Sequence, residues 1–312
     1  MNENTKNSTL QTVFHILAFS ASSEKRLLLF TVLLTIYLIA VTGNLVIIYL
    51  VFFMPRLQTS MYFFICNLSI LDILYISSTL PKLLYIIYTG DHSVSYNACL
   101  TQLYFFLFFA DTESFLITSM AIDRYVAICK PLHYSLIMNK RTCALLAVLA
   151  WCMAAVNALI LSWLIFGLSF RDFSNINNFF CDLKALLSIS CHDTTYARRF
   201  ILVDGMCIGV APFGLTLASY VFIISTILKI RSSEGRMKAF SSCSSHLCLV
   251  ILYYGSALCL YMRYSEEGDL LFSLLFVILV PFFNPLIYSL RNKDILSSLN
   301  RVLNCSSEHK LN

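Results

Sequence analysis

Residues Met120 to Tyr134 read Met-Ala-Ile-Asp-Arg-Tyr-Val-Ala-Ile-Cys-Lys-Pro-Leu-His-Tyr, and they follow directly on an apolar stretch that opens at Cys99. The neighbouring charges of Asp123 and Arg124 are costly in hydrocarbon unless they pair with each other or reach the membrane surface. The stretch therefore marks the place where a membrane helix meets water. Its charges serve either as simple anchors or as part of a functional site.

The rest of the chain has the composition of a membrane protein. Of its 312 residues 58% are hydrophobic and only 12% are charged, and the mean hydropathy is +0.76. Seven segments have the ~20 residues that a helix needs to cross a bilayer. Four of them carry no charge and three are interrupted by acids: Leu27–Phe53, Ser60–Tyr88, Cys99–Asp123, Thr142–Phe170, Phe200–Leu228, Ala239–Met262 and Leu270–Leu290. Because the alternation of a β-barrel is missing, the sequence predicts an all-α membrane protein, a bundle of seven transmembrane helices.

The distribution of Lys and Arg predicts the orientation of the bundle. If the N-terminus lies outside, the excess of basic residues falls on the inner side, as the positive-inside rule requires. Residues 1–26 then form an extracellular tail with a glycosylation acceptor at Asn7, 27–290 the seven-helix domain, and 291–312 a cytoplasmic tail. In that tail Arg291–Leu303 has the pattern of a short amphipathic helix on the membrane surface. The net charge of +5 therefore reflects topology and indicates no nucleic-acid partner.

The chain resembles the odorant (olfactory) receptors, a branch of the rhodopsin-like (class A) G-protein-coupled receptors. The resemblance extends from about Phe14 to Leu303. Three stretches carry most of it: Met120–Tyr134, Lys238–Leu247 (Lys-Ala-Phe-Ser-Ser-Cys-Ser-Ser-His-Leu), and Pro281–Asn292. It implies a receptor rather than an enzyme, which binds a small odorant and activates a heterotrimeric G protein of the stimulatory olfactory type, raising cyclic AMP. It also implies a place in the plasma membrane, in the cilia of olfactory sensory neurons.

The resemblance identifies a switch at the inner end of span three. Asp123 is expected to hold the guanidinium of Arg124 by a charge-assisted bond, beside Tyr125. Tyr220 and Tyr288, on spans five and seven, are candidates to capture Arg124 in an alternative arrangement. The basic inner face suits contact with anionic lipid and with the G protein.

A second polar group is expected in the middle of the membrane, formed by Asn44, Asp72, Glu113 and Asn284 on four different spans. It is either a structural network with one protonated acid or a proton or sodium site that biases the switch. Asp72 and Glu113 would be the sodium ligands, since carboxylate oxygens suit a hard cation. No other cofactor is expected.

The helical rise of 1.5 Å per residue places a third group in the outer half of the bundle, where a ligand would bind. The candidates lie on spans three, five and six: Phe106, Leu107, Ala110, Asp111, Asp204, Ile208, Tyr254, Leu258 and Tyr261. The alternative for each is packing within the bundle. Asp204, an acid in an apolar stretch, would favour ligands with a donor or cationic group.

Three cysteines, Cys99, Cys181 and Cys191, fall on the expected outer side. A Cys99–Cys181 disulfide would hold the long loop between spans four and five over the outer opening of the bundle. Cys191 would then have no cysteine left to pair with. Cys305, in the inner tail, is a candidate for palmitoylation.

Four positions depart from the family pattern: Ile122 and Tyr264 replace a Tyr and a Pro, Arg171 stands where many members have a cysteine, and Ser60 replaces a Pro. The last change is expected to loosen the start of span two. None of the four removes a switch residue. Two other functions fit the sequence less well: a rhodopsin-like receptor for a non-volatile metabolite outside the olfactory epithelium, and a channel or transporter.

Overall fold

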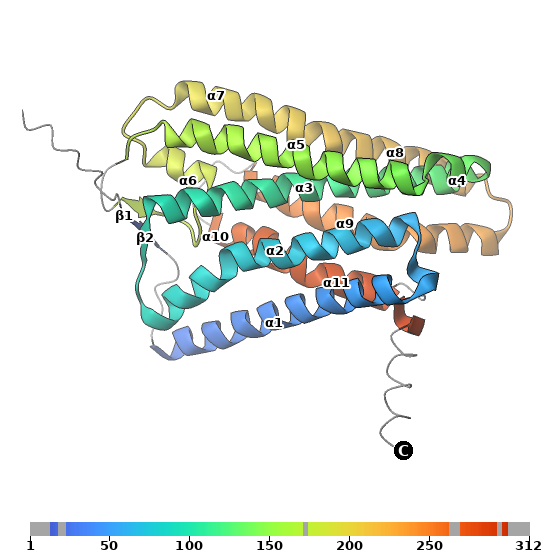
Figure 1. Cartoon of the computed structure of the whole chain (residues 1–312), viewed down its shortest axis with the longest axis horizontal. Helices are drawn as coiled ribbons and strands as arrows, with labels where there is room; N and C mark the ends of the chain where they lie inside the picture. Colours follow the sequence, from blue (N-terminus) through green and yellow to red (C-terminus); the bar gives the residue numbers. More distant parts are fainter. Residues whose placement is uncertain (1–12, 18–22, 171–173, 262–268, 292–294, 299–312) are drawn as a thin grey trace, which may run out of the picture.

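The computed structural model describes residues 13–17, 23–170, 174–261, 269–291 and 295–298. Over these residues the chain is a bundle of long helices that run side by side (Figure 1). Six helices are long and apolar enough to cross a membrane, and a shorter apolar helix covers Phe272–Tyr288. This architecture confirms the predicted seven-helix bundle.

The seven spans correspond to labelled helices, in chain order: α1 (Ser23–Phe53), α2 (Ser60–Thr89), α3 (Tyr96–Cys129), α5 (Lys140–Phe166), α7 with α8 (Thr195–Asp204 and Ala211–Leu228), α9 (Ser233–Tyr261), and α10 with α11 (Asp269–Leu274 and Val280–Arg291). Two short helices, α4 (Tyr134–Ile137) and α6 (Leu183–Ser188), lie in the connections. Single 3-10 turns cover Pro55–Leu57 and Pro131–His133.

Local sequence signals mark where several helices begin and end. The side chain of Ser95 accepts a hydrogen bond from the Ala98 amide and caps α3, and Asn139 caps α5 in the same way. Helix α2 ends at Gly90, whose positive φ of 75° is the left-handed conformation that glycine adopts most readily. Helix α3 runs on to Cys129, beyond the predicted end at Asp123.

Spans five and seven share an irregularity. A π-helical stretch, Gly205–Val210, separates α7 from α8, and a second, Leu275–Leu279, separates α10 from α11. Each ends two residues before a proline, Pro212 or Pro281. Since proline has no N–H and its ring displaces the carbonyl four residues earlier, the wider turn accommodates it within a continuous span.

Close packing brings the first and last spans together. A Cβ atom added at Gly43 of α1 would lie 3.1 Å from Cβ of Pro285 in α11, so glycine permits this approach. The neighbouring Asn44 is buried and donates to the Pro281 carbonyl at 3.3 Å. Spans one and seven therefore meet beside the mid-membrane polar residues.

A small sheet closes one end of the bundle. Strand β1 (Val13–Ile16) pairs antiparallel with β2 (Ser93–Ser95) and parallel with β3 (Asn175–Ile176). Phe14 and Ile16 are fully buried. The expected tail thus contains an ordered strand that sequence reasoning did not predict. We call this end, where Cys99 is bonded to Cys181, the disulfide end. Helix α4 lies at the opposite end, which we call the Arg124 end (Figure 1).

Several predictions concern residues that lie outside the described part of the chain, namely Asn7, Arg171, Tyr264 and Cys305. Of the predicted amphipathic segment Arg291–Leu303, the described residues 295–298 are helical, with Ile295 buried and Leu296 exposed. These four residues do not test the amphipathic pattern, and the predicted surface helix stays a prediction.

Candidate functional site

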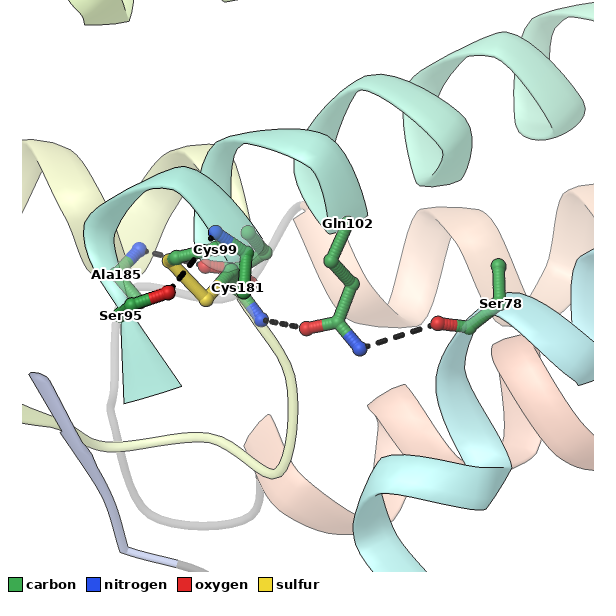
Figure 2. The surroundings of a disulfide bond; sticks show 8 residues. Ser78, Ser95, Cys99, Gln102, Cys181 and Ala185 are labelled. Carbon is green, nitrogen blue, oxygen red and sulfur yellow. Dashed lines mark hydrogen bonds between the residues drawn. A yellow bond between two sulfur atoms is a disulfide. The ribbon is translucent and has the colours of Figure 1, made fainter. Parts of the chain in front are cut away.

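The disulfide end is held together by a covalent bond. Cys99, in the first turn of α3, is bonded to Cys181, and both residues are fully buried. The Cys181 amide donates to Oε1 of Gln102 at 3.0 Å, and Nε2 of Gln102 donates to the Ser78 carbonyl at 3.2 Å (Figure 2). The predicted disulfide is therefore present and fixes the long loop to spans two and three. Cys191 is exposed and forms no disulfide within the described residues.

The loop carries two phenylalanines, Phe179 and Phe180, that are fully buried. The ring of Phe180 lies 4.7 Å from that of Phe106 on α3, centroid to centroid. Asn178, also buried, donates to Ser273 on α10 at 3.2 Å and to Asp182, which caps α6. Sequence reasoning missed these loop residues, because an irregular segment gives no periodic signal of what it buries.

An aromatic group continues from the loop into the bundle. Phe276, in the π-helical stretch of span seven, lies 6.4 Å from Phe106 and 5.4 Å from Tyr253 on α9. Tyr75 of α2 packs against Phe106 and Phe276 at 5.9 and 6.3 Å. We call Phe106, Phe180, Phe276 and Tyr253 the aromatic group.

The predicted ligand residues divide between this group and its surroundings. Phe106, Leu107 and Ala110 are buried on α3, and Tyr254 is buried on α9. Leu258 is 46% exposed and Ile208 is half-buried, and their role as ligand contacts stays a prediction. The side chain of Tyr261 lies outside the described residues.

Asp111 and Asp204 share one partner that sequence reasoning missed. Nδ2 of Asn157, on α5, donates to Oδ2 of Asp111 at 2.9 Å and to Oδ2 of Asp204 at 3.4 Å. Asn157 is buried, whereas both acids are partly exposed. An amide between two carboxyl groups supplies the partner that an acid in an apolar span needs. This contact supports the packing alternative for the two acids.

Two neighbouring tyrosines join α9 to α3 near its middle. The Tyr253 hydroxyl donates to the Ala110 carbonyl at 2.7 Å. The Tyr254 hydroxyl lies 3.1 Å from Oγ of Ser114, and either atom can be the donor. Both tyrosines are buried, so these bonds form away from water. Spans three and six are thus joined by specific polar bonds as well as by packing.

The four mid-membrane residues are all buried, and three of them, Asp72, Glu113 and Asn284, lie together. Nδ2 of Asn284 donates to both carboxylate oxygens of Asp72, each at 3.0 Å. Glu113 is fully buried and close enough to Asp72 to interact electrostatically. Both carboxylate oxygens of Glu113 and the amide oxygens of Asn44 and Asn284 accept no hydrogen bond from the described residues. Such oxygens are the hard ligands that a sodium ion prefers. The described residues hold no cluster of three His, Cys, Asp or Glu side chains that could bind a metal ion.

At the Arg124 end, the predicted pair of Asp123 and Arg124 is formed. Nε of Arg124 donates to Oδ2 of Asp123 at 3.1 Å, and both residues are buried. The hydroxyl of Tyr134, on α4, donates to the other oxygen, Oδ1, at 2.8 Å. Burial and the Asp123 carboxylate raise the pKa of Tyr134 above its ordinary value, so its hydroxyl stays protonated and donates. Tyr125 is half-buried, with its ring 6.0 Å from that of Phe222.

The two tyrosines proposed to capture Arg124 are placed differently in this structure. The Tyr220 hydroxyl bonds to Nδ1 of His246 on α9 at 2.7 Å, and Nε2 of His246 lies 3.1 Å from the Ile117 carbonyl on α3. The Tyr288 hydroxyl is buried and has no hydrogen-bond partner among the described residues. The capture of Arg124 stays a prediction for another arrangement of the bundle. His246, which joins spans three, five and six, was not singled out from the sequence.

The start of span two is tied rather than loosened. The Ser60 hydroxyl donates to the Met138 carbonyl at 3.0 Å, across the connection that contains α4. Met138 in turn donates its backbone N–H to the Tyr134 carbonyl at 2.8 Å. A proline at position 60 has no hydroxyl to make this bond. The serine therefore adds a contact that the expectation from the family pattern overlooked.

Comparison with known proteins gives a consistent result. A family model described as olfactory receptor matches residues 33–306. Olfactory receptor 5I1 of Homo sapiens is 43% identical over 302 residues, which cover 96% of this chain and 96% of the relative. Olfactory receptor 1E16 of Mus musculus is 42% identical over 311 residues, or 98% of this chain and 99% of the relative. Olfactory receptor 1 of Rattus norvegicus is 41% identical over 311 residues, or 98% and 99%.

Proposed function

The chain belongs to the olfactory receptor family, whose members are multi-pass membrane receptors and not enzymes, and from this premise we propose a specific signalling role. The receptor binds small, mostly apolar volatile molecules in the half of the bundle nearer the disulfide end. Binding there activates a heterotrimeric G protein of the stimulatory olfactory type at the Arg124 end and raises cyclic AMP. The observation that carries the proposal is α3 itself, which holds Phe106 and Ala110 in the half nearer the disulfide end and the Asp123–Arg124 pair near the other end.

The ligand would bind beside the aromatic group. Its four rings come from α3, α9, span seven and the long loop, so one small molecule in contact with them touches elements that are distant in sequence. Aromatic and aliphatic surfaces with few polar atoms suit neutral volatiles. A volatile of about ten heavy atoms at ~0.5 kcal/mol each gains ~5 kcal/mol, a dissociation constant of about 0.2 mM. We therefore expect weak and broadly tuned agonism.

The proposal includes an orientation in the plasma membrane. The disulfide end faces the extracellular side, because disulfides form in oxidising compartments. The Arg124 end faces the cytoplasm, where the excess of Lys and Arg is expected and where anionic lipid is in reach. For a neuron that senses volatiles, the ciliary membrane is the proposed location.

The G protein would contact the connection between α3 and α5. Leu132 in this connection is 93% exposed and Leu136 is 72% exposed. Exposed leucines beside Lys130 and His133 suit a partner with an apolar pocket and an acidic rim. In the active state Arg124 leaves Asp123, and Tyr220 or Tyr288 becomes its neighbour.

A sodium ion is proposed for the mid-membrane group. Asp72 and Glu113 would hold it, with the amide oxygens of Asn44 and Asn284 nearby. When bound, a sodium ion supplies positive charge that two buried carboxylates would otherwise lack. The alternative is that one of the acids is protonated and the group is a structural network.

The proposal is tested in cells that express the full chain together with the olfactory G protein α subunit. A panel of neutral volatiles and volatile amines is applied, and cyclic AMP and surface receptor are measured. We expect some neutral volatiles to raise cyclic AMP at about 0.1 mM, the range set by the ligand-efficiency argument. An Arg124→Gln receptor present at the same surface level is expected to give no response.

Two outcomes would contradict the proposal. One is a full response of Arg124→Gln, since the guanidinium is central to the proposed switch. The other is a ligand response carried by an ion current in cells without native channels, with no change in cyclic AMP. Asp204→Asn, compared with the exposed loop variant Asp193→Asn, tests the ligand preference separately. An unchanged ranking of amines and alcohols removes Asp204 as a ligand contact.

A further inference from the structure

The two tyrosines that join α9 to α3 differ in how closely they bond to a backbone carbonyl. Tyr253 donates to a backbone carbonyl, that of Ala110, at 2.7 Å. The Tyr254 hydroxyl lies 3.1 Å from the Ser114 hydroxyl and donates to the Ser114 carbonyl only at 3.5 Å. A carbonyl is fixed to the axis of its helix, whereas a hydroxyl can rotate and follow a moving partner. The Tyr253 bond is therefore the less tolerant of any displacement between the two helices.

The surroundings of Tyr253 make the loss of this bond costly. Tyr253 is 5% exposed, and its ring packs against Phe276 at 5.4 Å and Tyr254 at 5.0 Å. Water does not reach the hydroxyl to replace the Ala110 carbonyl. A buried donor that loses its acceptor carries the full desolvation cost of the group. The resting arrangement of α3 and α9 is thus favoured by one short bond in an apolar environment.

The same tyrosine is the last ring of the aromatic group. Phe180 of the loop touches Phe106, Phe106 faces Phe276, and Phe276 packs on Tyr253. Ala110, the acceptor, lies one helical turn from Phe106 on α3. A molecule that inserts beside Phe106 or Phe276 therefore displaces a ring that supports Tyr253, next to the carbonyl that Tyr253 bonds.

We propose that Tyr253 is the positioning residue through which an occupied ligand region releases α9 from α3. Its hydroxyl holds α9 in the resting arrangement, and the rings beside it transmit the presence of the ligand. This inference rests on the proposed function and adds the side chain that sets how readily the receptor activates. Tyr254 makes a smaller contribution, because its bond to a carbonyl is long and its shorter bond is to a hydroxyl that can rotate.

The test compares three phenylalanine variants, each of which removes only a hydroxyl. They are Tyr253→Phe, Tyr254→Phe, and, as a matched control, Tyr104→Phe at a partly exposed site on α3. Cyclic AMP without ligand and the half-maximal concentration of one agonist are measured at equal surface receptor. Loss of one neutral bond shifts the resting equilibrium by a factor of about 2 to 10.

Tyr253→Phe is expected to raise basal cyclic AMP by that factor and to lower the half-maximal agonist concentration by a similar factor. Tyr254→Phe shifts both less, and Tyr104→Phe leaves both unchanged. Basal activity at or below that of the unmodified receptor, at equal surface level, overturns the inference even if the agonist still signals. A chain in which no variant responds to any volatile, while forskolin still raises cyclic AMP, argues instead against the proposed function.

Discussion

The first turns of α3 are held by a covalent bond, whereas its last turns are held by noncovalent contacts, among them polar bonds that other groups can replace. At the disulfide end Cys99 is bonded to Cys181, and Gln102 joins the loop to span two. At the Arg124 end Asp123 holds Arg124 and accepts from Tyr134. A disulfide does not exchange on the time scale of signalling, but ion pairs and hydrogen bonds at a water boundary do.

This difference indicates how one helix can connect a ligand to a partner. A fixed end keeps the ligand-side residues in register, and a releasable end allows a second arrangement of the switch. Between the two ends, α9 is joined to α3 by Tyr253, Tyr254 and His246. Movement is therefore expected at the Arg124 end of α9 and not at the disulfide end of α3.

The largest effect is expected from removing the fixed end. Cys99→Ser breaks a disulfide that closes 82 residues of sequence, which contributes about 4 kcal/mol to stability by the chain-entropy argument. We expect little of this receptor at the cell surface and no odorant response, measured by surface staining and cyclic AMP. The control is Cys191→Ser, at an exposed cysteine without a described partner, which should behave normally. If the Cys99→Ser receptor reaches the cell surface and signals normally, the disulfide is not needed to hold this end of α3.

A smaller effect is expected from weakening the releasable end. Tyr134→Phe removes the hydroxyl that donates to Asp123 at 2.8 Å. The bond helps to orient the carboxylate that holds Arg124, so its loss favours release and raises basal cyclic AMP. A factor of about 10 to 150 corresponds to the ~1.5 to 3 kcal/mol of a hydrogen bond to a charged group. If basal signalling falls while the surface level is unchanged, Tyr134 supports the active arrangement instead.

The smallest effect is expected at the start of α2. Ser60→Ala removes the bond to the Met138 carbonyl and leaves the turn that carries Tyr134 less well held. A change in basal cyclic AMP of about twofold is expected for one partly exposed hydrogen bond. Ser60→Thr keeps a hydroxyl and should restore the original level. A threonine variant that behaves like the alanine variant would mean that the hydroxyl does not matter.

The sequence predicted the number of spans well because the bilayer demands long apolar helices, and their residues lie together in the chain. The disulfide was also predictable, since only three cysteines fall on the expected outer side. Strand β1 was not, because its pairing with β2 and β3 joins three distant segments of two to four residues. The alternation of buried and partly exposed residues in β1 covers only four residues, too few to distinguish a strand from an irregular tail.

The candidate site was most predictable where a motif specifies a local contact. Asp123 and Arg124 are adjacent, so their pairing follows from the sequence. The contacts of Asn157 with Asp111 and Asp204, and of His246 with Tyr220, join residues that are far apart in the chain. Helical spacing gives the depth of a residue but leaves the rotation of its helix undetermined, so it does not show which of the outer residues face a common pocket.

The comparison of the two ends of α3 is tested most directly by measuring distances from α3 to α9 at both ends. Spin labels are introduced as non-natural amino acids, because the chain has twelve cysteines. One pair is Lys130 with Met237 at the Arg124 end, and the other is Asn97 with Leu258 at the disulfide end; all four side chains are exposed. With agonist and G protein bound, we expect the Lys130–Met237 distance to lengthen and the Asn97–Leu258 distance to stay the same. Equal changes at both ends, or none at the Arg124 end of a signalling receptor, would contradict this account.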